Sequence, residues 1–169
     1  MPSNTKENGF ETLIVEYLIN NNGYEQGDTN EYNKEYAIDE DRLFRFLLSP
    51  QKKSMCEFHI LVSDLEKERF LSQLDKKLKN DGVIELLRKG IRYKHLRLDL
   101  FYVRPSIHNP EAAELYEKNI FSVTRQLQYS SFNPRLALDV CIFINGLPVI
   151  TMELKNQLIK QGRYTDPVD

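Results

Sequence analysis

LALDVCIFINGLPVITMELKN, residues 136–156, contains two apolar segments, each with one carboxylate. Asp139 lies inside the first segment, and Glu153 lies near the end of the second. Segments 136–144 and 148–155 predict two β-strands joined through Asn145 and Gly146. The first segment is apolar without alternation, as expected for a strand covered on both faces, and Asp139 interrupts it. We therefore expect Asp139 to be partly buried.

The second segment carries polar residues at alternate positions near its end. Alternation along a strand places Thr151, Glu153 and Lys155 on one face. A desolvated carboxylate costs several kcal/mol unless it is paired, hydrogen-bonded or bound to a metal. Asp139 and Glu153 could meet this requirement by binding Mg²⁺, which prefers oxygen ligands, and Lys155 could orient or deprotonate a metal-bound water. The same Glu-x-Lys spacing also fits an ordinary amphipathic edge strand, so both interpretations stay open.

The connection between the two strands decides whether the carboxylates can meet. In a regular two-residue turn at Asn145-Gly146, Asp139 would face Met152, and Glu153 would lie on the opposite side of the sheet. A three-residue turn, a five-residue loop or a bulge within a strand would correct this mismatch. We expect one of these irregular connections, because a regular turn without a bulge would exclude the metal site.

The rest of the chain predicts a helix-rich first part, followed by strands with one helix between them. Apolar periodicity and stop signals predict helices over 10–20, 39–48, 63–81, 83–89 and 109–118. The third of these begins with a capping box from Ser63 to Glu66. Strands are predicted over 55–62, over 91–103 as one or two strands, and over 120–129 as a half-buried strand. This order predicts an α/β (α+β) fold, a mixed sheet flanked by helices, in a single domain over 1–169.

Composition is that of an ordinary globular protein, with 41% apolar and 28% charged residues. The chain shows no secretory leader and no apolar stretch near the ~18 residues of a membrane span, so we expect a cytoplasmic protein without membrane contact. Cys56 and Cys141 are expected to be reduced thiols. The three histidines have no partner at zinc-like spacing, which argues against a zinc site.

Charge is unevenly distributed, although the net charge is only −2. Seven acidic residues and one lysine lie between Glu25 and Asp41, whereas the segment 88–97 is basic and contains no acid. Such a basic segment fits contact with a nucleic-acid backbone, but it also fits a solvated face. The candidate DNA-binding residues are Arg88, Lys89, Arg92, Lys94 and Arg97.

Three stretches of the chain resemble a known family. LDVCIFINGLPVITMELKN at 138–156 resembles the nuclease region of the restriction subunit of type I restriction-modification enzymes, where an Asp strand, an Asn-Gly-Leu-Pro turn and a Glu-Leu-Lys-Asn strand follow one another. YEKNIFSVTRQLQYSSFNP at 116–134 looks like the segment that leads into this hairpin, and GFETLIVEYLINNNGY at 9–24 is similar to the first helix of the family.

The resemblance implies a restriction-endonuclease-like fold that binds Mg²⁺ and cleaves double-stranded DNA. It implies that Asp139 and Glu153 are metal ligands and catalytic groups and that Lys155 is the catalytic lysine. Glu11 would match an acidic helix residue that supports the metal, although a solvent-facing helical glutamate is an equally good interpretation. The implied partners are the modification and specificity subunits of the same system.

Members of the family continue into an ATP-dependent motor, and this chain has no Gly-x-x-x-x-Gly-Lys-Ser/Thr motif for ATP. We therefore expect ATP to act only through motor domains absent from this chain, which would be a fragment of a larger subunit. Two functions stay open: a type I site-specific deoxyribonuclease, or a catalytically silent DNA-binding or subunit-assembly module that retains the nuclease fold.

Overall fold

The computed structural model describes residues 7–57, 63–106, 109–133 and 135–154, and only the backbone at 7–8 and 52–57. Its main sheet has the order β1-β6-β7-β8, formed by Glu25–Gln26, Phe121–Gln128, Ala137–Ile144 and Leu147–Met152. β1 runs parallel to β6, and the other neighbours are antiparallel. Two small hairpins accompany it, β2 (Tyr32–Asn33) with β3 (Ile38–Asp39) and β4 (Ile91–Tyr93) with β5 (Leu96–Leu98).

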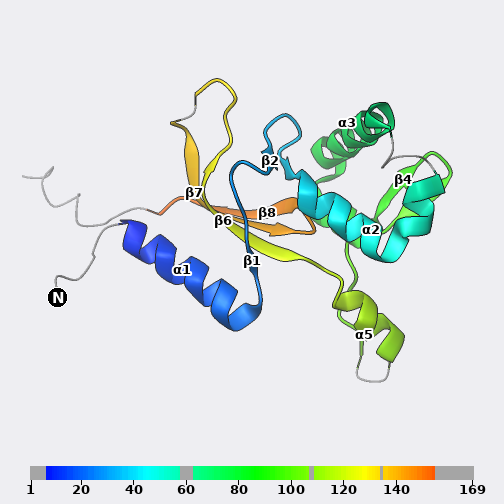
Figure 1. The fold of residues 1–169 in the computed structure, drawn as a ribbon, viewed down its shortest axis with the longest axis horizontal. Helices are drawn as coiled ribbons and strands as arrows, with labels where there is room; N and C mark the ends of the chain where they lie inside the picture. Colours follow the sequence, from blue (N-terminus) through cyan, green and yellow to red (C-terminus); the bar gives the residue numbers. More distant parts are fainter. Residues whose placement is uncertain (1–6, 58–62, 107–108, 134, 155–169) are drawn as a thin grey trace, which may run out of the picture.

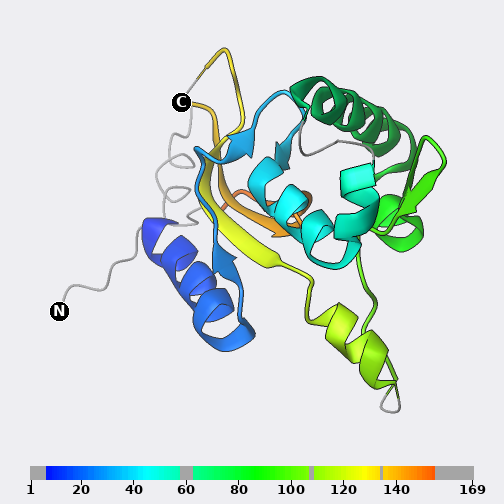
Figure 2. The same cartoon turned by 45° about the vertical axis from the view of Figure 1, so that its right-hand side comes forward.

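The described residues form five helices: α1 (Glu7–Asn22), α2 (Glu40–Glu57), α3 (Asp64–Asp81), α4 (Val83–Lys89) and α5 (Pro110–Tyr116). Figures 1 and 2 show α1 on one side of the main sheet and α2 with α3 on the other. The expected α+β fold with a mixed sheet flanked by helices is confirmed. No helix in the described part of the chain is long and apolar enough to cross a membrane.

The two faces of the sheet belong to separate apolar clusters. Val15 of α1 packs against Val123, Val140 and Ile142. On the opposite face, Cys141 and Phe143 pack with Leu127, and Tyr32 of the β2–β3 hairpin covers them. Both faces of β7 are thus buried, which explains its apolar sequence without alternation. The largest cluster joins α2, α3, α4 and the β4–β5 hairpin, and it includes Ile38 of β3 and Leu147 of β8.

The Asn145-Gly146 turn is buried, which is unusual for a hairpin turn. Asn145 exchanges hydrogen bonds with the backbone of Ile120, and its Nδ2 donates to the carbonyl of Leu100 at 2.9 Å. The backbone of Gly146 lies against α2, where an added Cβ would stand 2.3 Å from the carbonyl oxygen of Asp39 and 2.6 Å from the amide nitrogen of Leu43. This contact fixes the end of the β7–β8 hairpin on the first turn of α2.

Two of the predicted elements were wrong around Pro50. The helix predicted over 39–48 continues through Pro50 to Glu57, so residues 55–57 are helical rather than the start of a strand. A kink at Gln51 (φ −115°, ψ 20°) accommodates the proline. The Gln51 side chain stabilises this kink by hydrogen bonds to the amide and the carbonyl of Asp99. The remainder of that predicted strand, 58–62, lies outside the described residues.

Smaller differences concern helix starts and the edge of the sheet. Ser63 precedes α3, but the predicted capping box is wrong, since the Ser63 side chain makes no capping hydrogen bond and the Glu66 side chain pairs with Arg69 and Lys94. Asn109 caps α5 by accepting a hydrogen bond from the amide of Ala112. The half-buried pattern predicted for 120–129 was wrong in part, since Ser122 and Thr124 on the second face are also buried.

We predict that Gly146→Ala lowers the free energy of unfolding by about 3 kcal/mol, because the added methyl group meets backbone atoms that cannot move aside. Gly23→Ala is the matched control: its φ is also positive, at +69°, but nothing lies within 4 Å of the added Cβ. It should cost only about 1 kcal/mol. Urea denaturation followed by circular dichroism measures both values, and equal losses would contradict the buried turn.

Candidate metal centre

The β7–β8 hairpin contains the irregularity on which the metal site depends. The turn itself is regular, since Ile144 pairs with Leu147 and Phe143 with Pro148. The next pair is Ile142 with Ile150, so Val149 is an extra residue on β8. The expectation of a bulge within a strand is confirmed. Val140 consequently pairs with Met152, so the residues that follow β8 come level with Asp139.

Asp139 is half-buried and both of its carboxylate oxygens accept hydrogen bonds. Oδ2 accepts from the backbone amide of Leu154 at 2.6 Å, and Oδ1 accepts from Nε2 of Gln126 at 3.2 Å. The first of these bonds ties Asp139 to the residue that follows Glu153. The carboxylate of β7 and the end of β8 are therefore in direct contact.

Glu11 of α1 approaches the same place from the helix layer. It stands one turn before Val15, so the packing of Val15 on the sheet turns Glu11 inward as well, and only 1% of Glu11 is exposed. Its Oε1 accepts from Nε2 of Gln126 at 3.0 Å, and its Oε2 lies 3.4 Å from Nη2 of Arg125. The interpretation of Glu11 as a solvent-facing helical residue is therefore wrong.

A local break in the β6–β7 ladder brings these groups together. Arg125 pairs with Val140 and Leu127 with Leu138, but Gln126 and Asp139 between them do not form a ladder pair. Leu127 and Leu138 then pack on the face opposite to Val123 and Val140. The break thus reverses the alternation of both strands and sends Gln126 and Asp139 towards α1.

The donor set fits Mg²⁺ in its chemistry. Glu11 and Asp139 offer hard carboxylate oxygens that converge on one nitrogen atom, and Mg²⁺ is commonly held by one or two carboxylates with waters completing the shell. Among the described residues, no three acidic, His or Cys side chains converge as a ready-made metal cage. Residues of this chain that would hold the ion are Asp139, Glu11 and Glu153.

The remaining candidate residues stand in different positions. Glu153 is exposed at the end of β8, next to Leu154. Lys155 lies outside the described residues. The five basic candidates, Arg88, Lys89, Arg92, Lys94 and Arg97, are all exposed, on α4 and the β4–β5 hairpin. This hairpin lies at the opposite end of the molecule from α1 (Figures 1 and 2), so the structure does not bring the basic segment into the carboxylate cluster.

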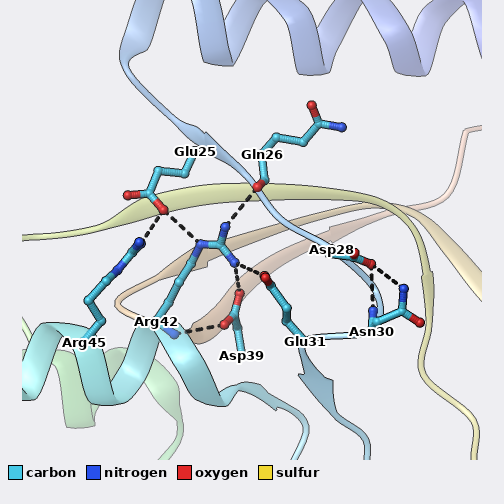
Figure 3. A network of polar contacts seen from close by, with 8 residues as sticks. All are labelled: Glu25, Gln26, Asp28, Asn30, Glu31, Asp39, Arg42 and Arg45. Atoms are coloured by element: carbon cyan, nitrogen blue, oxygen red, sulfur yellow. Dashed lines mark hydrogen bonds and ion pairs between the residues drawn. The ribbon is translucent and has the colours of Figure 1, made fainter.

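Arg42 binds three of the seven acidic residues of segment 25–41, as Figure 3 shows. The buried guanidinium of Arg42 contacts Asp39 at 2.6 Å, Glu31 at 2.8 Å and Glu25 at 3.2 Å. Burial raises the pKa of Asp39, and the hydrogen bonds and charge of Arg42 oppose this rise. Because every group in this cluster has a partner within the protein, we interpret it as a structural tie between the β1–β2 segment and α2.

Sequence reasoning missed Gln126, Arg125 and the amide of Leu154. Gln126 reaches Asp139 only because β6 and β7 pair in one particular register, and no local pattern indicates it. Cys141 is fully buried in the core, and burial raises its pKa to about 12. Such a thiol is a poor nucleophile.

Comparison with known proteins supports one family. The family model described as "Type I restriction enzyme R protein N terminus" matches residues 4–166 of the 169-residue chain. No curated protein and no solved structure matches the chain.

We predict that Arg42→Met destabilises the protein by about 3 kcal/mol, because it leaves the buried carboxylate of Asp39 without its partner. Arg45→Met is the control, since Arg45 pairs with Glu25 but is half exposed, and it should cost less than about 1 kcal/mol. Chemical denaturation of both variants measures the difference. A small loss in Arg42→Met would show that the cluster is not a structural tie.

Proposed function

The chain belongs to the family of type I restriction enzyme R protein N termini, and from this premise we propose that it is the Mg²⁺-dependent endonuclease domain of such an enzyme. It would hydrolyse phosphodiester bonds of unmodified double-stranded DNA as part of an ATP-dependent translocating complex. The observation that carries the proposal is the one-residue bulge in β8, which brings the segment that carries Glu153 alongside Asp139, where the amide of Leu154 donates to Asp139. Without the bulge, Met152 rather than Glu153 would come level with Asp139.

Each residue of the site has a distinct role in this proposal. Asp139, Glu11 and Glu153 hold the ion, and the amide of Leu154 orients the carboxylate of Asp139. The ion, when bound, lowers the pKa of a coordinated water and neutralises charge on the scissile phosphate. Lys155 orients or deprotonates the attacking water, or stabilises negative charge that develops at phosphorus.

DNA positioning would come from other parts of the chain. Arg92 and Arg97 face each other across the β4–β5 hairpin and would contact backbone phosphates, which positions DNA without reading its sequence. Lys89 and Lys94 form ion pairs with Glu85 and Glu66 and would add positive charge to the same surface. Sequence would be read by the specificity subunit, and ATP would be used by motor domains elsewhere in the restriction subunit.

We predict that the purified chain nicks supercoiled plasmid in Mg²⁺ and that Asp139→Asn, Glu153→Gln and Lys155→Ala each reduce the rate by about 100-fold or more. Removing Mg²⁺ with EDTA should abolish nicking. Gel analysis of plasmid conversion over time measures these rates.

Glu11→Gln and Glu16→Gln form a matched pair on α1, because Glu11 is buried against the site and Glu16 is exposed. Only Glu11→Gln should slow cleavage. Absence of cleavage by the wild-type chain, with salt-sensitive DNA binding retained, would instead favour the catalytically silent binding or assembly module. Equal cleavage by wild type and all variants would contradict the assigned residues.

We also predict that the double variant Arg92→Ala, Arg97→Ala weakens DNA binding and reduces the slope of log affinity against log salt by about 2, since two phosphate contacts are lost. Fluorescence anisotropy with labelled duplex DNA at several salt concentrations measures the slope. Lys77→Ala with Lys79→Ala is the control, because these lysines pair with Asp81 and Asp75 on α3. An equal effect of both double variants would exclude a specific role for the hairpin.

A further inference from the structure

The side chain of Gln126 lies between the two carboxylates that come from α1 and β7. Its Nε2 is 3.0 Å from Oε1 of Glu11 and 3.2 Å from Oδ1 of Asp139. Ionised carboxylates accept hydrogen bonds and cannot donate them, so the end of the amide that faces both must be its NH₂ group. One NH₂ group therefore bridges the two carboxylates, of which Glu11 also lies 3.4 Å from Nη2 of Arg125 and Asp139 also accepts from the amide of Leu154.

The backbone of Gln126 supports a specific role. Its φ of +48° lies in the left-handed region, which residues other than glycine rarely adopt, and it occurs within the central strand β6. Strain of this kind persists only where the surrounding structure enforces it. Here it accompanies the break in the β6–β7 ladder, which directs Gln126 towards Glu11 while Leu127 packs on the other face.

The NH₂ group and a divalent cation would bind the same carboxylate oxygens. A cation shared by Glu11 and Asp139 would satisfy both charges more strongly than two neutral N–H donors can. Because the amide already holds the carboxylates in place, no large rearrangement of α1 or β7 is needed before the ion binds. The amide must then turn away from at least one of the two oxygens.

We propose that Gln126 is a positioning residue that holds Glu11 and Asp139 together in the absence of a cation. When a divalent cation binds between them, the amide of Gln126 turns away from at least one of the two carboxylates. This inference rests on the proposed function, because it requires a cation site at Asp139. The neutral amide lies between the two carboxylates, where the cation would bind. It keeps the two carboxylates in place before an ion binds and competes only weakly with that ion.

Thermal unfolding of the full chain in EDTA and in saturating MgCl₂ tests this role. Gln126→Glu replaces the NH₂ group by a third carboxylate, so its Tm in EDTA should fall by about 3 °C or more relative to wild type. Mg²⁺ should then raise the Tm of Gln126→Glu by about twice the increment seen for wild type, because the ion relieves the added repulsion. Gln126→Met, which is neutral and cannot donate, should also show a larger increment than wild type.

Gln128→Glu is the matched control, because it makes the same change of charge two residues along β6, at a position that is exposed as Gln126 is. Its Mg²⁺ increment should equal that of wild type. Increments for Gln126→Glu and Gln126→Met that do not exceed the wild-type increment would overturn the inference, and smaller ones would show that Gln126 is itself a ligand. If wild type shows no increment and cleaves no DNA, the proposed function fails together with this inference.

Discussion

The offset of one residue between β7 and β8 is the constraint on which the candidate site depends. The turn at Asn145-Gly146 is a regular two-residue connection, and by itself it would separate Asp139 from Glu153. The bulge at Val149 follows Pro148, which cannot donate a ladder hydrogen bond and is commonly found at such irregularities. Asn145 contacts Leu100, and Gly146 contacts the start of α2. These contacts hold the turn in place and so keep the bulge at its position in β8.

A second irregularity on the other side of β7 complements the first. The unpaired positions of Gln126 and Asp139 turn both side chains towards α1, where Glu11 is buried at the cost of desolvating its carboxylate. The apolar contact of Val15 with Val123 and Val140 keeps α1 in place against this cost. Packing of α1 and assembly of the carboxylates are therefore one event, and weakening the helix contact would also disperse the site.

Much of this arrangement follows from local sequence patterns. The strands on either side of Asn145-Gly146, the cap of α5 at Asn109 and the need for a bulge all come from short-range rules of pairing and capping. The role of Gln126 does not, because its partners are set by strand register and by a helix from the start of the chain. The helix through Pro50 was missed for a similar reason. Its kink is stabilised by Asp99, which lies far along the sequence from Gln51.

Crystals of the full chain grown with Mn²⁺ in place of Mg²⁺ would test the central claim most directly. An anomalous difference map locates the ion without any assumption about catalysis. We predict a peak within coordination distance, about 2.2 Å, of carboxylate oxygens from Asp139 and Glu153, with Glu11 beside it. A well-occupied Mn²⁺ elsewhere, with no peak at Asp139, would contradict it.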